Sequence, residues 1–411
     1  MNTGPRSAER LLRWELDAPC CFVVPPDVVA QVAHTGSSEA REAAIRTIGA
    51  SAALRARRTI VTQVLRQLNV GLADLTFLVP PSGESRAVYD AKHQGSSALP
   101  GDKARGENDP PAPDPAVNEA FDGADVTYRF YRDVFQRQSI DGKGLQLVSS
   151  VHYGQDFDNA LWNGAQMIYG DGSGQVIASG SLTKAVDVIG HELTHGVTQL
   201  TAGLEYRTQP GALNESFSDV FGSLVKQYAG SQTADQADWL IGEGVLGSAL
   251  HGQALRSLKD PGTAFDMDRQ PGHMSKYVNL PDDNDPRNDN GGVHINSGIP
   301  NRAFYLVATA IGGHAWEKAG KIWYVTLTQH LQPDSDFVAA ANATVKAAGD
   351  LFGAGGEEQK TVRDAWQQVG VLGTGGGAAP APAPTSTSTV GASQPAPTAP
   401  ASTAGAPPPT A

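Results

Sequence analysis

The chain has 411 residues, with 31 lysines and arginines against 43 aspartates and glutamates, which gives a formal net charge of −12. This acidic balance argues against a protein that binds nucleic acid or an anionic membrane. Hydrophobic residues make up 40% of the chain and charged residues 18%, so a sizeable core can form. The only two cysteines are adjacent, Cys20 and Cys21, which excludes a disulfide framework and a multi-cysteine zinc site.

We also expect no membrane span, because no window approaches 18 uninterrupted apolar residues, and we expect a monomer. The first residues carry both charge signs and lead to no apolar stretch, so a standard secretory signal is not expected. The predicted compartment is therefore either the cytoplasm or the outside of the cell, reached by a non-standard route.

The pattern of apolar residues predicts a small separate unit first, over residues 1–86, with a helix at 38–68 and an apolar segment at 75–79. Residues 94–115 are rich in proline and charge, which predicts a long surface loop. Alternation then predicts strands at 146–153 and 166–169, followed by a hairpin-type turn at 170–174.

From residue 187 onward the pattern turns helical. The spacing predicts six helices, at 186–200, 215–229, 297–312, 317–331, 336–352 and 357–369. Residues 374–411 hold no charge and no aromatic side chain, which is typical of a disordered Pro/Ala/Thr/Ser-rich tail. The order predicts an α+β protein: a strand-rich part over 87–200, then a helical part over 201–373.

A His-Glu-x-x-His motif lies in the first of these predicted helices, at residues 191–195. Four residues turn a helix by about 400°, so His191 and His195 lie on one face and can share a metal ion. A catalytic zinc ion needs a third protein ligand and an open position for water. In metzincins that ligand is a histidine six residues after the second one, but this position is Thr201, which excludes that class.

Glu215 on the next predicted helix can supply the third ligand, with Asp219 one turn later on the same face. Asp219 could then accept the free N–H of a metal-bound imidazole. On spacing alone, a zinc ligand and a solvated helix carboxylate are equally good interpretations of Glu215.

Further stretches resemble the thermolysin-like zinc metallopeptidases, the neutral metalloproteases, in the family's order from residue 87 to about 372. They are DNALWNGAQMIYGDG (158–172), DVIGHELTHGVT (187–198), TAGLEY (201–206), GALNE (211–215), SDVFG (218–222), ALRS (254–257) and DNGGVHINSGIP (289–300). The resemblance implies a two-lobed fold with the 187–198 helix between the lobes.

The resemblance also implies roles for single residues. His191, His195 and Glu215 would bind zinc, and Glu192 would take a proton from the water that attacks the peptide carbonyl. Tyr206 and His294 would donate to the oxyanion, with Asp289 orienting His294. Without the resemblance, a tyrosine after a turn or a lone histidine is more often an ordinary core or surface residue.

The implied substrate contacts complete the site. Asn159 and the Ala160 backbone would align a peptide as an added strand, and Arg256 would bind the carbonyl of the residue after the scissile bond. The pocket for that residue's side chain would be lined by four apolar residues, Leu182, Val188, Val245 and Leu255. We therefore expect cleavage on the amino side of hydrophobic residues.

The sequence departs from the family at its double calcium site. Two of the five carboxylate positions hold Lys226 and Leu240, which leaves Asp187, Asp238 and Glu243 as candidate calcium ligands. Because an ammonium group can neutralise the remaining carboxylates, we expect at most one weakly bound Ca²⁺ beside the zinc.

The N-terminal unit resembles the short pro-region of the protealysin-like subgroup, through residues 22–29 and the helix after them. We expect a zymogen whose residues 1–86 block the cleft, with Pro25 and Pro26 in an extended segment, and which removes them itself near 78–90. A thiolate from Cys20 or Cys21 on the open zinc position is an alternative means of blocking.

Two other functions remain open from the sequence: a catalytically silent relative that only captures peptides, and a zinc hydrolase of another carbonyl substrate. The joint presence of Glu192, Tyr206 and His294 argues against the first. Asn159 and Arg256 suit a peptide backbone and argue against the second.

Overall fold

The computed structural model describes residues 21–68, 85–283 and 285–373. Its main sheet has the strand order β1-β5-β6-β4-β2-β3. The strands are β1 (Cys21–Phe22), β2 (Arg86–Asp90), β3 (Asp102–Gly106), β4 (Leu147–Val151), β5 (Ala160–Trp162) and β6 (Met167–Tyr169). The three neighbours β2, β4 and β6 run parallel, whereas β3, β5 and β1 pair in antiparallel fashion with their partners.

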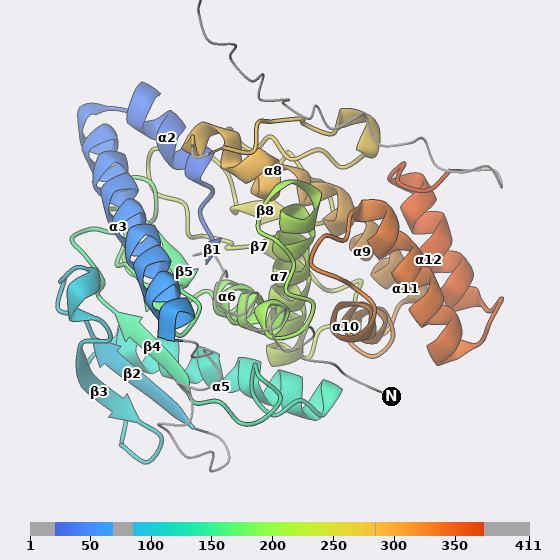
Figure 1. The fold of residues 1–411 in the computed structure, drawn as a ribbon, viewed down its shortest axis with the longest axis horizontal. Helices are drawn as coiled ribbons and strands as arrows, with labels where there is room; N and C mark the ends of the chain where they lie inside the picture. The colour runs from blue at the N-terminus through green and yellow to red at the C-terminus, as the bar shows by residue number, and fades with distance from the viewer. Residues whose placement is uncertain (1–20, 69–84, 284, 374–411) are drawn as a thin grey trace, which may run out of the picture.

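Helices make up most of the second half of the described chain and fill the centre and right of Figure 1. They are α6 (Val186–Gln199), α7 (Thr208–Ala229), α8 (Asp289–Asn296), α9 (Gly298–Ile311), α10 (Ala319–Gln329), α11 (Phe337–Phe352) and α12 (Glu357–Gln368). A two-stranded ribbon of β7 (Leu240–Ile241) and β8 (Arg256–Ser257) lies beside the upper part of α7 in that view. The predicted α+β fold, strands first and helices second, is confirmed.

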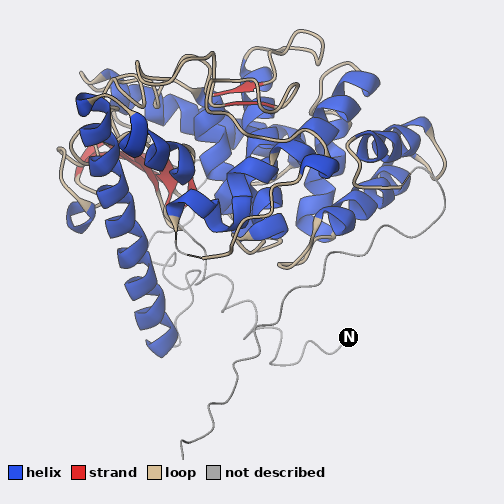
Figure 2. Ribbon diagram, turned by 90° about the horizontal axis from the view of Figure 1, so that it is seen from above, coloured by secondary structure: helices blue, strands red, loops and turns tan. Residues whose placement is uncertain are grey.

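The N-terminal region forms two helices, α2 (Pro26–Thr35) and α3 (Ser38–Leu68), which lie over the strand-rich lobe in Figure 1. The far end of α3 extends away from the body in Figure 2. The prediction of a separate unit over 1–86 is wrong in one respect, because β1 pairs with β5 and so completes the sheet of the following lobe. Pro25 is extended as expected, but Pro26 is the first residue of α2, where its missing N–H costs nothing.

Two local predictions are also wrong. Residues 94–115 are not only loop, since Asp102–Gly106 forms the edge strand β3, whose first three residues are exposed and give no apolar alternation. Residues 170–174 do not form a hairpin, because no strand of the main sheet follows β6. Helix α5 (Pro115–Phe135) was not predicted, although Pro115 opens it and Asp114 caps it by accepting from the Ala116 N–H. The segment 75–79 and the tail 374–411 lie outside the described residues.

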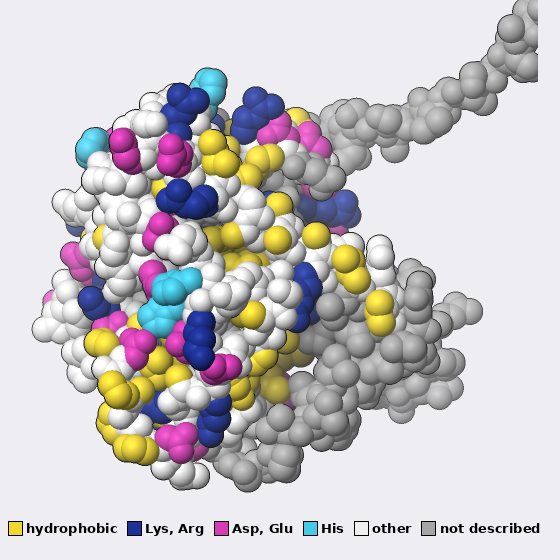
Figure 3. All heavy atoms as spheres, turned by 90° about the vertical axis from the view of Figure 1, so that its left-hand side faces the viewer, with side chains coloured by type: hydrophobic (Ala, Val, Ile, Leu, Met, Phe, Trp, Pro, Cys, Tyr) yellow, Lys and Arg dark blue, Asp and Glu magenta, His cyan; other side chains and the backbone are white. Residues whose placement is uncertain are grey.

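A close helix contact brings α6, which carries His191 and His195, against α7, which carries Glu215. A Cβ at Gly222 of α7 would lie 2.5 Å from the backbone oxygen of Asp187 and 3.0 Å from the backbone nitrogen of His191. Only glycine therefore allows α6 and α7 to pack at this distance. The face of the molecule seen in Figure 3 mixes acidic, basic and apolar side chains. Within the described ranges, no helix combines the length and apolar character that crossing a bilayer requires.

Candidate metal centre and active site

The motif histidines and Glu215 meet where α6 packs on α7. His191 Nε2 lies 3.1 Å from His195 Nε2 and 3.5 Å from Glu215 Oε2, and His195 Nε2 lies 3.4 Å from Glu215 Oε1. All three side chains are fully shielded from solvent. Of the two interpretations of Glu215, the structure places it with the histidines rather than in solvent.

This donor set fits zinc. With ligand bonds of about 2.1 Å, ligand atoms on a tetrahedral zinc ion lie roughly 3.4 Å apart, close to the 3.1–3.5 Å found here. Glu215 Oε2 is buried and has no hydrogen-bond partner in the described chain. Burial lowers the pKa of His195 to about 3, so its ring is neutral and free to bind a metal. Among the described residues, the cluster consists of these three ligands and does not include Cys21. Cys20 lies outside the described residues.

The far ring nitrogens of both histidines lie beside polar side chains of α7. His191 Nδ1 lies 2.9 Å from Asp219 Oδ1. His195 Nδ1 lies 2.8 Å from Asn214 Oδ1 and 3.0 Å from Ser218 Oγ. Partners at Nδ1 leave Nε2 as the metal-binding atom of each ring and fix the orientation of the ring.

Glu192 projects from α6 toward β5. Its Oε2 accepts the Trp162 N–H at 2.8 Å, whereas Oε1 is buried without a partner. Burial and the nearby Glu215 carboxylate raise the pKa of Glu192 well above its usual value. A carboxylate with one fixed and one open oxygen, and a raised affinity for protons, is suited to act as a base.

The residues predicted to donate to the oxyanion lie beside Glu215. The Tyr206 hydroxyl bonds Glu215 Oε1 and lies 3.3 Å from His294 Nε2. Asp289 accepts from the His294 ring at 2.5 Å and from the backbone N–H of His294 at 2.7 Å. Although burial lowers the pKa of His294, the carboxylates of Glu215 and Asp289 outweigh this and raise it to about 10. His294 is therefore charged at neutral pH and can donate from both nitrogens.

Local backbone geometry explains how Asp289 reaches His294. Asn290, Gly291 and Gly292 have φ of 50°, 81° and 84°, so the start of α8 is not helical. This turn lets the Asp289 carboxylate cap the N–H groups of His294 and Ile295. The two glycines suit a conformation that other residues adopt at a cost.

The N-terminal segment lies across this site as an added strand. The Val23 N–H donates to the Ala160 carbonyl at 3.1 Å, and the Asn159 side chain bonds both the N–H and the carbonyl of Val24, at 3.0 and 3.2 Å. His294 Nε2 lies 2.8 Å from the Phe22 carbonyl oxygen. The residues predicted to align a peptide therefore hold residues 22–24 of the same chain.

Val23 and the four residues of the predicted side-chain pocket are all buried. Val23 is fully buried and belongs to one hydrophobic cluster with all four predicted pocket residues, Leu182, Val188, Val245 and Leu255. Because the Val23 carbonyl accepts from Arg256, this apolar residue has the position that the resemblance gives to the residue after the scissile bond.

Arg256 joins this segment to the metal centre. Its Nη1 donates to the Val23 carbonyl at 2.8 Å, and its other nitrogens bond both oxygens of Asp219 at 2.8–3.0 Å. Asn301 also donates to Asp219. Burial raises the pKa of Asp219, but Arg256 and His191 more than compensate, so the pKa is lowered and the carboxylate is charged.

At the candidate calcium site, the Lys226 ammonium group lies among the carboxylates. Its Nζ is 2.5 Å from Asp238, 3.5 Å from Asp187 and 3.7 Å from Glu243. These contacts provide a positive charge where the family would have metal ions.

Sequence reasoning missed the supports of the metal ligands. Asn214, Ser218 and the Trp162 N–H were not proposed, and Arg256 was not connected to Asp219. Asn214 and Ser218 are four residues apart in α7, so helical spacing could have placed them on one face. The Trp162 and Arg256 contacts join distant segments and have no local signal.

Comparisons with known proteins agree with this geometry. The sequence model of the thermolysin metallopeptidase catalytic domain matches residues 62–199, and that of the thermolysin metallopeptidase alpha-helical domain matches residues 202–371. An extracellular metalloprotease of Pectobacterium carotovorum subsp. carotovorum is 45% identical over 359 residues, which are 86% of this chain and 97% of the relative. A thermolysin of Alicyclobacillus acidocaldarius subsp. acidocaldarius is 41% identical over 299 residues, which are 70% of this chain and 51% of the relative.

A solved structure extends the likeness to the N-terminal region. The precursor of protealysin, a metalloproteinase from Serratia proteamaculans, matches with a TM-score of 0.73 and 45% identity, over 86% of this chain and all of that chain. The predicted resemblance to the short pro-region subgroup is confirmed. The chain belongs to the thermolysin family of metallopeptidases, and it is a zinc hydrolase of peptide bonds that carries a pro-region.

Proposed function

We propose that this endopeptidase cleaves on the amino side of hydrophobic residues and that residues 22–24 inhibit it by binding as a substrate does. The observation that carries the proposal is the position of Val23. Its side chain is fully buried, its N–H donates to the Ala160 carbonyl, and its own carbonyl accepts from Arg256, which is predicted to bind the carbonyl of the residue after the scissile bond. A substrate peptide would replace this segment strand for strand.

We propose a role in peptide-bond hydrolysis for each of the side chains around the Phe22–Val23 bond. Bound to His191, His195 and Glu215, zinc would polarise the peptide carbonyl and activate water. Glu192 would receive the proton of the attacking water on its open oxygen, Oε1. Tyr206 and His294 would donate to the carbonyl oxygen as negative charge develops on it, and His294 already contacts that oxygen in Phe22.

We further propose that the enzyme processes itself. In this proposal the Phe22–Val23 bond lies where the scissile bond of a substrate would lie. Because the bond and the active site belong to the same chain, its cleavage would be intramolecular. Of the region of cleavage predicted from the sequence, 78–90, residues 78–84 lie outside the described residues and Arg86–Asp90 forms β2. This region would be cut once the cleft can accept another segment, which would release the pro-region.

Cleavage of a peptide library by the matured enzyme tests the preference. Peptides with valine, leucine or phenylalanine after the scissile bond should be cut, and those with aspartate or glycine there should not. Because a hydrophobic pocket discriminates between aliphatic side chains by only about 1–3 kcal/mol, we expect weak selection among them. Preferential cleavage before charged residues would contradict the proposal.

We also propose that the enzyme is a monomer and acts on peptides or proteins outside the cell. The name of the Pectobacterium relative, an extracellular metalloprotease, favours the second of the two predicted compartments. Immunoblots of cells and culture medium from the native host would test this assignment, with a strictly cellular signal contradicting it.

A further inference from the structure

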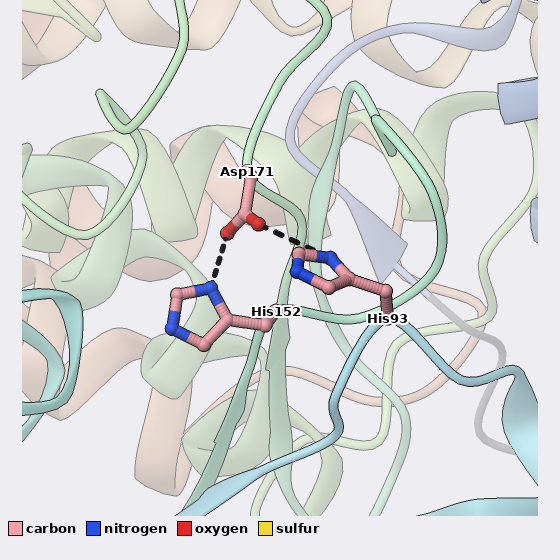
Figure 4. Close-up of side chains that lie close together, drawn as sticks. All are labelled: His93, His152 and Asp171. Atoms are coloured by element: carbon pink, nitrogen blue, oxygen red, sulfur yellow. Dashed lines mark hydrogen bonds and ion pairs between the residues drawn. The ribbon is translucent and has the colours of Figure 1, made fainter. Parts of the chain in front are cut away.

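A second cluster of metal-binding side chains lies at the carboxyl ends of the three parallel strands. His93 follows β2, His152 follows β4 and Asp171 follows β6, and these strands are neighbours in the sheet. Because the carboxyl ends of parallel strands meet at one edge, the three side chains converge there (Figure 4). None of them belongs to the His191 centre.

The distances suit a single metal ion. His152 Nδ1 lies 2.8 Å from Asp171 Oδ1, and His93 Nδ1 lies 3.4 Å from Asp171 Oδ2. The three ligand atoms lie within 4.8 Å of one another. Ligand atoms on a tetrahedral zinc ion are roughly 3.4 Å apart, so small side-chain rotations would complete the geometry. Half of the His93 side chain is exposed, so an ion can enter from solvent.

Asp114 orients one of the two imidazoles. It caps helix α5 with one carboxylate oxygen, and the other lies 2.7 Å from His152 Nε2. His152 donates from Nε2 to Asp114 and from Nδ1 to Asp171. A metal ion would replace the proton on Nδ1, while Nε2–H would still donate to Asp114. A carboxylate, a histidine and a metal in this order are a common arrangement at zinc sites.

Backbone bonds hold the loops that carry the cluster. The His93 N–H donates to the His152 carbonyl at 2.8 Å, and the Gly154 N–H donates to the Gln94 carbonyl at 3.0 Å. His93 and His152 both have a positive φ, of 57° and 55°, which few non-glycine residues adopt. The two rings are thereby fixed with centroids 5.6 Å apart.

We propose that His93, His152 and Asp171 form a second, solvent-accessible site for a divalent transition metal, with zinc as the expected ion. Two imidazoles and one carboxylate favour zinc over calcium or magnesium, which prefer oxygen ligands. Water would complete the coordination. Such an ion would tie together the ends of β2, β4 and β6, independently of the catalytic centre.

Zinc content tests this proposal in the full-length Glu192→Gln chain, which removes the proposed base and retains the metal ligands. The protein is equilibrated with excess zinc chloride, freed of unbound metal by gel filtration and analysed by elemental mass spectrometry. We expect two zinc ions per chain, and one after a further His93→Ala or Asp171→Asn substitution. His195→Ala in place of His93→Ala should also leave one, because it removes only the catalytic ion.

His251→Ala is the matched control, because His251 is exposed and stands outside both clusters found among the described residues. It should retain two zinc ions. The proposal is overturned if the parent chain binds a single zinc ion, if His93→Ala leaves the count at two, or if His251→Ala lowers it as much as His93→Ala does.

Discussion

Truncation of Val23 to alanine should open the cleft of the precursor. Val23 is fully buried, and its carbonyl accepts from Arg256, as expected for the residue after the scissile bond. Removing two methyl groups loses about 1.6 kcal/mol of transfer free energy, and the remaining cavity raises the cost to roughly 2 kcal/mol. This cost falls only on the closed state, because the pro-segment is released from the pocket in the open state. The open fraction should therefore rise about 30-fold.

The assay uses a competitor that binds only the open cleft, in the full-length Glu192→Gln chain. A fluorescent peptide hydroxamate with a leucine side chain for the pocket is titrated, and anisotropy gives its Kd. Because the apparent Kd varies inversely with the open fraction, Val23→Ala should tighten binding about 30-fold.

Val362→Ala provides the control, since Val362 is equally buried but lies in α12. It should lower Tm and leave the Kd of the competitor unchanged. An unchanged Kd for Val23→Ala, or the same shift in both variants, would refute the view that Val23 fills the substrate pocket.

Three further predictions concern charge. With the zinc site kept saturated, a calcium-selective chelator should lower Tm by less than about 10 °C, because Lys226 already pairs with the carboxylates. Lys226→Glu should make Tm depend on calcium. A fall in the Tm of the wild type by more than about 10 °C on chelation would contradict this. Burial and the Asp289 carboxylate raise the pKa of Asp27 in the closed precursor, despite the Arg269 ion pair and the nearby His294. The closed state thus binds more protons than the open state, and rising pH favours the open state. The apparent Kd of the competitor should therefore fall as pH rises from about 4 through the raised pKa of Asp27. Asp27→Asn should remove this pH dependence of the Kd, and a pH dependence that persists would contradict the assignment. In the matured enzyme, Arg256→Lys should lower kcat/KM about 100-fold or more, since one ammonium group cannot bond both Asp219 and the substrate carbonyl; a loss below tenfold would exclude this role.

The helices that could be predicted are those in which apolar residues recur at helical spacing over a long segment. The helix predicted at 38–68 has the bounds of α3, and that at 186–200 differs from α6 by one residue at its C-terminus. The His-Glu-x-x-His spacing placed His191 and His195 on one face because the geometry of a helix is local. Glu215 could be assigned only through the resemblance, since its contact with the histidines depends on how α6 and α7 pack.

The short strands escaped prediction for a different reason. β1 and β5 have two and three residues, too few for alternation to be detected, and their pairing joins segments more than 130 residues apart. The substrate-like position of Val23 follows from this pairing. Contacts such as Arg256 with Asp219 likewise depend on the folded chain, so the sequence could name both residues without joining them.

Zinc content, processing and hydrolysis, measured together on the wild type and on Glu192→Gln, test the catalytic assignment most directly. The wild type should hydrolyse peptides and yield new N-termini at Val23 and between about residues 78 and 90. Glu192→Gln should keep the zinc of the wild type, because Glu192 is not a ligand, but remain full length and lose hydrolysis by several orders of magnitude; His195→Ala should lose both the catalytic zinc and the activity. Hydrolysis or trimming that persists in purified Glu192→Gln, made in a host without other proteases, would contradict the account.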